Sequence, residues 1–365
     1  MKKLIFTALG VLACSAYASA DVTVRFSDNQ PDTLYSVEHM LISDMVKSRA
    51  ERPMPIIDTL QSKAGILSFK LDSEAPARYM VRKLNDRQGA EFYAAPNEKL
   101  AIIFNSNDPV DYIVTGSKLM DGVTEIKQQM NDVMKQYQAL NSAANKDEAA
   151  INNLVQKYEA IAPSYLAANP NNPAALYALL NMDGEAFMNA FNNLNADMQK
   201  EILYPLVENH KQYVERSIAA DKKLHDLQAG NVPAPNFTLK DLQGKEVSLS
   251  DFKGKWVILD FWGSWCGWCI KGMPALKDAY EQYKPELEVI GIDCNETEDR
   301  WRKAVEKYQL PWVHVYNPAT SSLLSDYGVT GFPTKAIINP EGKIANITVG
   351  EDPSFFDTLA RLMTK

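Results

Sequence analysis

The sequence predicts an α/β domain at its C-terminal end, preceded by a β-sandwich-like domain and a helical segment. Three patterns predict this order. Apolar and polar residues alternate in short runs over residues 21–118, apolar residues recur at helical spacing over 119–229, and strand-like and helix-like segments alternate over 230–365. A chain of 365 residues is long enough for two or three domains.

The first twenty residues have the pattern of a secretory signal peptide. A pair of lysines precedes an apolar run over residues 4–13 that is too short to span a bilayer, and Ala18-Ser19-Ala20 is a small-residue cleavage site. Residues 11–14 partly resemble a lipoprotein cleavage box, which would make Cys14 a lipidated N-terminus. We expect residues 1–20 to be removed and the protein to reside in the periplasm or cell envelope, with lipid anchoring at Cys14 as the alternative.

Charge and cysteine usage exclude several classes of function. The formal net charge is −8, and removing Lys2 and Lys3 with the leader, which has no acids, changes it to −10. An acidic chain without a Lys and Arg cluster argues against a nucleic-acid partner. Outside the leader only three cysteines remain, too few for a small disulfide-stapled scaffold, so a single Cys-x-x-Cys pair in an exported chain indicates catalysis.

Residues 21–118 are predicted to form the β-sandwich-like domain, because their runs alternate with period two and turn residues separate them. The clearest runs are Val22–Phe26, Ile66–Leu71, Tyr79–Val81 and Leu100–Phe104, with a turn at 107–109. Over 119–229 glycine and proline become rare and helical spacing predicts five or six helices, interrupted at 169–173. A helical repeat array is the alternative, but no consensus recurs at a fixed period.

A linker signal at 230–235 precedes the predicted α/β domain. Strands alternating with helices imply a sheet with helices on both faces. In order, the pattern predicts a hairpin around residues 237–249, a strand at 256–261 interrupted by Asp260, a helix from about 266 to 283, a strand at 289–293, a helix at 298–308, a strand near 313, strands at 335–338 and 344–349, and a last helix from 354.

Cys266 and Cys269 form a Cys-x-x-Cys pair at the start of a predicted helix. Unpaired N–H groups and the helix dipole favour negative charge there, which lowers the pKa of a thiol. The thiolate is the nucleophile of disulfide exchange. Cys269 lies one turn further on the same face and can attack a mixed disulfide on Cys266. We therefore predict that Cys266 is the exposed attacking residue and Cys269 the buried resolving residue.

Two structural interpretations of the pair compete with this one. A structural zinc site needs four ligands, and the remaining candidates are Cys294 and four histidines that show no ligand spacing. A purely structural disulfide is the other. We expect no metal and no cofactor, and we interpret Cys294 as a small buried residue, although a third redox thiol is the alternative.

Residues 232–365 resemble the thioredoxin superfamily, and within it the exported thioredoxin-like reductases of the cytochrome c maturation and AhpC/TSA-like type. The resemblance rests on several segments in the same order as in that family rather than on one motif. These are Ala234–Leu239, Asp241–Lys245 and Ser250–Lys255 for the entry hairpin, Asp260–Cys269 for the active-site segment, Gly331–Thr334 for the cis-proline loop and Asn339–Lys343 for the hairpin after it.

The resemblance implies roles for particular residues in the catalytic steps. Asp260 would lie buried beneath Cys269 and take its proton, because burial raises a carboxyl pKa into the range of a general base. Glu296 would approach the active-site thiols. Pro333 would be cis and packed against the disulfide, with the backbone on its Thr334 side free to pair with an extended substrate.

The resemblance also implies the substrate-binding surface. It would comprise Trp265, Gly267, Trp268, Phe332 and Pro333, with Trp262 and Trp265 as wall and rim of the groove. Trp268 departs from the family, since thioredoxin has proline there. The dipeptide between the cysteines tunes the reduction potential, so this position leaves the direction of exchange open.

The function predicted from these features is an envelope thiol–disulfide oxidoreductase. Its partners would be protein thiols and disulfides, together with a membrane electron donor of the thiol–disulfide relay type that keeps the pair reduced in an oxidising space. The alternatives are a disulfide oxidase or isomerase, and a redox-switched partner-binding protein. A thiol peroxidase is disfavoured, because tryptophans stand where its signature has proline and threonine. Residues 21–118 weakly resemble a β-rich domain of bacterial envelope proteins, which implies substrate selection or dimerisation through the N-terminal or helical region.

Overall fold

The computed structural model describes most of the chain in two compact units, one up to Val214 and one from Glu215. The division falls inside one long helix, whereas the sequence places a boundary after residue 229; the extents of the domains therefore stay a prediction. The structure describes residues 21–26, 32–48, 51–105, 108, 110–142 and 146–364. The leader, which includes Cys14, lies outside these ranges.

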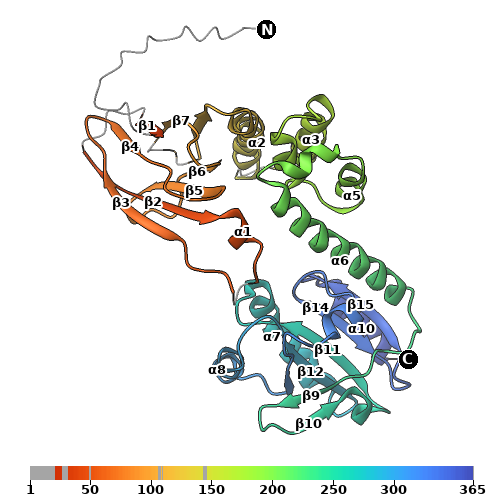
Figure 1. Cartoon of the computed structure of the whole chain (residues 1–365). Helices are drawn as coiled ribbons and strands as arrows, with labels where there is room; N and C mark the ends of the chain where they lie inside the picture. Colours follow the sequence, from red (N-terminus) through yellow and green to blue (C-terminus); the bar gives the residue numbers. More distant parts are fainter. Residues whose placement is uncertain are drawn as a thin grey trace. The chain divides into compact units, whose positions relative to one another are not determined.

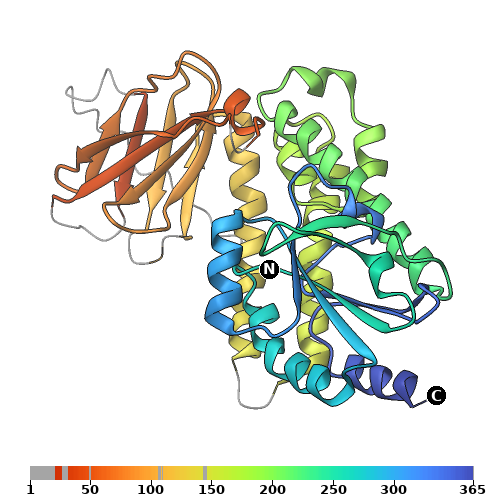
Figure 2. The same cartoon turned by 90° about the horizontal axis from the view of Figure 1, so that it is seen from below.

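The first unit begins with two four-stranded sheets, which confirms the expected β-sandwich (Figures 1 and 2). One sheet has the order β4-β1-β7-β8 and the other β3-β2-β5-β6. The bounds are β1 Val22–Phe26, β2 Leu34–Leu41, the short helix α1 Ile42–Met45, β3 Ile56–Gln61, β4 Ile66–Phe69, β5 Ala77–Lys83, β6 Ala90–Ala94, β7 Leu100–Phe104 and β8 Tyr112–Thr115.

Alternation along the strands places one apolar face of each sheet in the sandwich core. In β7, Leu100, Ile102 and Phe104 are buried while the residues between them are exposed. The rings of Phe26 in one sheet and Tyr35 in the other stack with centroids 4.4 Å apart. The period-two pattern therefore predicted this face correctly, because successive side chains of a strand point to opposite sides.

Helices follow the sandwich, as their spacing in the sequence predicts. They are α2 Lys118–Asn141, α3 Glu148–Ala168, α4 Ala174–Leu179, α5 Gly184–Asn192, a 3-10 turn at Ala196–Lys200 and α6 Tyr204–Gln228. Ser117 caps α2 by accepting a hydrogen bond from the Met120 N–H. The Thr124 hydroxyl donates to the Val114 carbonyl at 2.7 Å and so joins α2 to β8.

The second unit is built on a seven-stranded mixed sheet with the order β10-β9-β13-β12-β11-β14-β15. β11, β12 and β13 are parallel, and β14 pairs antiparallel with β11. The bounds are β9 Thr238–Asp241, β10 Glu246–Ser248, β11 Trp256–Trp262, α7 Gly267–Tyr283, β12 Leu287–Asp293, α8 Glu298–Tyr308, β13 Val313–Tyr316, α9 Leu323–Asp326, β14 Thr334–Ile338, β15 Ile344–Val349 and α10 Ser354–Met363.

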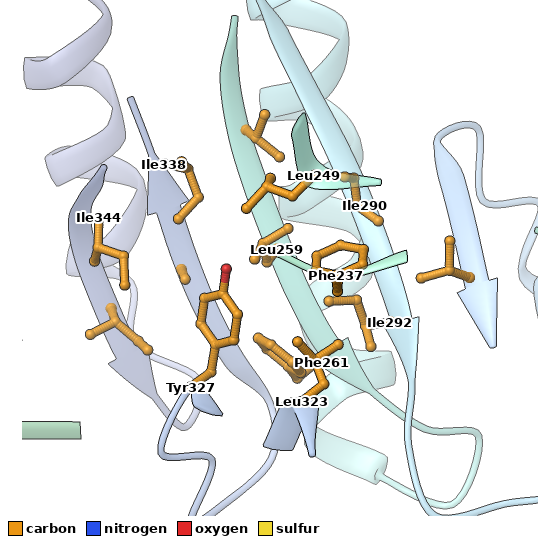
Figure 3. Close-up of a cluster of buried hydrophobic side chains, with 14 of the residues drawn as sticks. Phe237, Leu249, Leu259, Phe261, Ile290, Ile292, Leu323, Tyr327, Ile338 and Ile344 are labelled. Atoms are coloured by element: carbon orange, nitrogen blue, oxygen red, sulfur yellow. The ribbon is translucent and has the colours of Figure 1, made fainter. Parts of the chain in front are cut away.

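Apolar side chains cover both faces of this sheet, which confirms the α/β architecture. α7, α8 and α10 pack on one face. On the other, Leu227 of α6, Phe237 and Tyr327 join the inward residues of the strands in a second core, shown in Figure 3. Short α9 was not expected, since four residues are too few to show a helical period.

The last turns of α6 belong to the second unit because they pack closely on it. Gly328 follows α9 with φ of +60°, and a Cβ there would lie 2.5 Å from the Leu224 nitrogen. Only glycine accepts both that backbone conformation and that approach. In the described part of the chain, no helix is both long and apolar enough to cross a membrane.

Candidate active site

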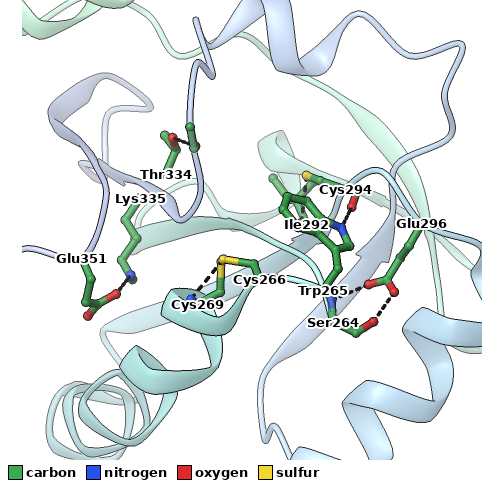
Figure 4. Close-up of a disulfide and its surroundings, with 11 residues drawn as sticks. Ser264, Trp265, Cys266, Cys269, Ile292, Cys294, Glu296, Thr334, Lys335 and Glu351 are labelled. Carbon is green, nitrogen blue, oxygen red and sulfur yellow. Dashed lines mark hydrogen bonds and ion pairs between the residues drawn. A yellow bond between two sulfur atoms is a disulfide. The ribbon is translucent and has the colours of Figure 1, made fainter. Parts of the chain in front are cut away.

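β11 and α7 place the Cys-x-x-Cys pair just beyond the C-terminal end of β11, an internal strand of the sheet. β11 ends at Trp262, and Cys266 is the N-cap of α7 with extended backbone. The Cys266 Sγ accepts a hydrogen bond from the Cys269 N–H at 3.1 Å (Figure 4). The cysteines form a disulfide. Position and hydrogen bond together favour a thiolate at Cys266 in the reduced state.

Exposure does not distinguish the two cysteines in the disulfide state. Cys266 is 6% exposed and Cys269 is 5% exposed. The difference between them lies in the helix: Cys266 caps it, whereas Cys269 is inside its first turn. The assignment of Cys266 as attacking residue and Cys269 as resolving residue therefore stays a prediction that rests on helix position.

Asp260 is a buried carboxyl in the middle of the strand that precedes the pair. It is 4% exposed, and burial raises its pKa from 3.8 to about 6. Among the described residues its Oδ1 has no hydrogen-bond partner. A carboxyl with this pKa can both take and return a proton near neutral pH, as a general base must.

Glu296 follows β12 and binds the loop that precedes Cys266. Its side chain is 0% exposed, and it accepts hydrogen bonds from the Ser264 N–H at 2.6 Å and from the Ser264 hydroxyl. Burial and the neighbouring Glu296 carboxylate raise the pKa of Asp293 to about 9. Glu296 is therefore placed to hold the loop, and its action on the thiols stays a prediction.

Replacing Glu296 with alanine is expected to lower the free energy of unfolding by roughly 1–3 kcal/mol, because it leaves the Ser264 N–H without its acceptor. Urea denaturation measures the change. Glu298→Ala is the matched control: Glu298 is 51% exposed and pairs with Arg302 on the surface of α8, so its loss is expected to be smaller, under about 1 kcal/mol. Equal losses in both variants would contradict the buried hydrogen bonds.

Exposed aromatic residues border the disulfide. Trp265 is 44% exposed and Trp268 is 62% exposed. The Trp265 indole N–H donates to the Cys294 carbonyl at 2.8 Å, and its ring meets that of Phe332 edge-on. Gly267 is exposed between the cysteines. These residues lie where a substrate-binding surface was predicted, although their role in binding stays a prediction.

Trp262 does not form the wall of a groove, contrary to expectation. It is 1% exposed and packs in the core with its ring edge-on to His314. As the last residue of β11 it points to the face that α7 covers. The turn between Trp262 and Cys266 lets Trp265 reach the surface instead.

The Phe332–Pro333 peptide bond is cis, as the resemblance implies. The backbone on the Thr334 side is not available to a substrate, which corrects that expectation. Thr334 is aligned in the sheet between Phe261 and Val349, and the Pro333 carbonyl accepts the Gly350 N–H at 2.7 Å. Those sheet partners already occupy this backbone.

Cys294 is fully buried. Its Sγ lies 3.3 Å from the Ile292 carbonyl, and burial raises the pKa of the thiol. Both properties are typical of an unreactive thiol. In the described ranges no group of three or more His, Cys, Asp or Glu is arranged to hold a metal ion.

Two charged residues at the site were not anticipated from the sequence. Lys335 of β14 is 4% exposed and forms an ion pair with Glu351 at 2.9 Å. A lysine followed by three apolar residues inside a predicted strand was the available signal. Glu351 comes from the loop after β15, and nothing in its local sequence indicates the approach.

Comparisons with known proteins place the second unit among thiol–disulfide oxidoreductases. The AhpC/TSA family model matches residues 231–347. A thiol-disulfide oxidoreductase ResA of Bacillus cereus is 38% identical over 133 residues, which cover 36% of this chain and 75% of the relative. The ResA of Bacillus subtilis is 36% identical over 118 residues, covering 32% and 65%.

Solved structures give matches of the same extent. The thioredoxin domain of a thiol-disulfide oxidoreductase from Bacteroides vulgatus is 34% identical with a TM-score of 0.35, covering 37% of this chain and 97% of that one. A thiol:disulfide interchange protein from Bacteroides sp. is 33% identical with a TM-score of 0.35, covering 37% and 90%.

Proposed function

The chain belongs to the family of thiol-disulfide oxidoreductases that includes ResA, and on that basis we propose that it reduces disulfide bonds of proteins through Cys266 and Cys269. The observation that carries this proposal is the hydrogen-bonded position of Cys266 at the start of α7, 3.1 Å from the Cys269 N–H. A pair held there can cycle between dithiol and disulfide.

The proposed reaction has two steps in which electrons and protons balance. The Cys266 thiolate attacks one sulfur of the substrate disulfide, a mixed disulfide forms and the other substrate sulfur leaves as a thiolate. Asp260 then takes the proton of Cys269, whose thiolate attacks the Cys266 Sγ. The Cys266–Cys269 bond forms, the mixed disulfide breaks and the second substrate sulfur leaves as a thiolate, which takes up the proton from Asp260. The pair loses two electrons and the substrate gains them.

A reductase in an oxidising compartment needs a source of electrons. We propose that the protein works in the periplasm or cell envelope, where a membrane donor of the thiol–disulfide relay type returns the pair to the dithiol. The signal-peptide pattern of residues 1–20 supports the location. Exported reductases of this type serve cytochrome c maturation, which makes proteins of that process candidate substrates.

For residues 21–229 we propose substrate selection or homodimerisation. The edge strand β3 supports this proposal, because none of its residues is buried and Ile56 and Ile57 are exposed by 59% and 53%. An edge strand presents backbone groups that can pair with another chain.

A glutathione redox titration followed by tryptophan fluorescence tests the direction of the reaction, since Trp265 and Trp268 flank the pair. A reductase is expected to have a potential near about −270 mV and to catalyse reduction of insulin by dithiothreitol. A potential near about −120 mV would instead assign the protein as an oxidase. A purely binding protein would show no turnover at all.

A further inference from the structure

A largely buried ion pair lies on the strand next to Asp260. Lys335 is the cross-strand neighbour of Asp260, since β14 pairs with β11 in that register. Its Nζ lies 2.9 Å from Glu351 Oε2, and the lysine is 4% and the glutamate 18% exposed. Figure 4 shows both side chains on one side of the cysteines, with Ser264 and Glu296 on the other.

Two glycines allow Glu351 to reach this position. A Cβ on the buried Gly272 of α7 would overlap the Glu351 carboxylate, with its Cδ only 2.5 Å away. Gly350, with φ of +84°, turns the chain after β15 while its N–H donates to the Pro333 carbonyl at 2.7 Å. The loop that carries Glu351 is thereby tied to the cis-proline loop, and a gap in α7 receives its carboxylate.

The two charges act on Asp260 in opposite directions. After burial, the largest effect on the Asp260 pKa is the Lys335 ammonium, which lowers it, and the Glu351 carboxylate raises it. The buried thiol of Cys294 also interacts with the Asp260 carboxyl, which contributes to raising the pKa of that thiol. Glu351 also pairs with Lys335 directly, and this ion pair partly neutralises the positive charge that acts on Asp260.

We propose that Lys335 and Glu351 are positioning residues for Asp260, and that Gly272 provides the space through which Glu351 reaches Lys335. The proposal rests on the proposed function, in which Asp260 takes the proton of Cys269. The positive charge of Lys335 stabilises the ionised form of the Asp260 carboxyl in an apolar core. Glu351 pairs with the Lys335 ammonium and weakens its effect on Asp260, so that the Asp260 carboxylate remains basic enough to accept a proton.

The resolving step can be measured by itself with an aryl disulfide. The reduced protein is treated with one equivalent of dithiobis(nitrobenzoate). The Cys266 thiolate breaks the reagent's disulfide, releases one coloured thionitrobenzoate and keeps the other in a mixed disulfide. Attack by Cys269 then releases the second thionitrobenzoate, and this later kinetic phase reports the resolving step. The wild-type rate is expected to rise with pH through a midpoint near the Asp260 pKa of about 6.

Three substitutions are expected to move this midpoint in a defined pattern. Glu351→Gln lowers it by roughly one pH unit, since both effects of Glu351 on Asp260 are lost. Gly272→Ala lowers it as well, because the new Cβ displaces the carboxylate. Lys335→Met raises it by roughly one unit. Opposite shifts separate electrostatic positioning from simple loss of packing, and the carboxyl ¹³C resonance of Asp260 measures the same midpoints without the reaction.

Glu341→Gln, on the exposed turn after β14, is the control and is expected to retain the wild-type midpoint. Unshifted midpoints in Glu351→Gln and Gly272→Ala would overturn the inference, and both variants keep it testable if Lys335→Met does not fold. Failure of the proposed function is a separate outcome: Asp260→Asn would then leave the rate of thionitrobenzoate release and its pH profile unchanged.

Discussion

Replacing Cys266 with serine is expected to abolish disulfide reduction, with a loss of at least about a thousandfold in turnover, because the thiolate that attacks the substrate is missing. Cys269→Ala is expected to be equally inactive in turnover but to accumulate mixed disulfides with its substrates. The two inactive variants are therefore expected to differ in whether they retain a substrate as a mixed disulfide. Non-reducing gels and mass spectrometry of the trapped adducts measure the difference.

Cys294→Ala is the matched control for these variants. Its thiol is fully buried and its pKa is raised, so its removal is expected to leave both turnover and trapping unchanged. Accumulation of adducts by the Cys266 variant, and not by the Cys269 variant, would reverse the two roles. Since the cysteines are almost equally exposed in the disulfide state, trapping is the measurement that separates them.

Replacing Asp260 with asparagine is expected to stabilise the oxidised protein at pH 8 by up to roughly 3 kcal/mol. Burial raises the carboxyl pKa from 3.8 to about 6, and each pKa unit corresponds to about 1.4 kcal/mol. Because the folded-state pKa is the higher one, the protonated carboxyl is favoured by folding. The associated stability is complete below pH 3.8 and is lost as the pH rises to about 6.

Urea denaturation of wild type and Asp260→Asn at pH 4 and pH 8 measures this effect. The stability difference is expected to be small at pH 4 and large at pH 8. Asp299→Asn, at a position that is 72% exposed and pairs with Lys303, is expected to change stability by under about 1 kcal/mol. A wild-type protein as stable as Asp260→Asn at pH 8 would show that the buried carboxylate carries no such penalty.

Local patterns in the sequence predicted most helices and strands, because the spacing of apolar residues follows the repeat with which side chains point to one face of a helix or strand. Alternation in residues 21–118 reflects the two faces of a strand, and the run at 256–261 reflects a strand buried on both faces. Asp260 stood out because a carboxyl interrupts that run. Chain order also placed Cys266 at a helix start, and the structure confirms it.

Tertiary contacts decided which side chains are buried and which distant residues they bind, which the spacing of apolar residues could not predict. Trp262 and Trp265 look alike in sequence, yet the first is in the core and the second is at the surface, since the turn between them sets their directions. Glu296 binds Ser264, 32 residues earlier in the chain.

The cysteine pair, its helix start and the acid before it were determined by the sequence alone, because each depends on neighbours within one strand–helix unit. The surroundings of Asp260 were decided by the fold. Lys335 reaches it through strand pairing and Glu351 through the gap at Gly272, and both approaches depend on the meeting of segments that are far apart in the chain. The chemistry of the site is therefore readable from sequence, whereas the electrostatic control of its base requires the packed structure.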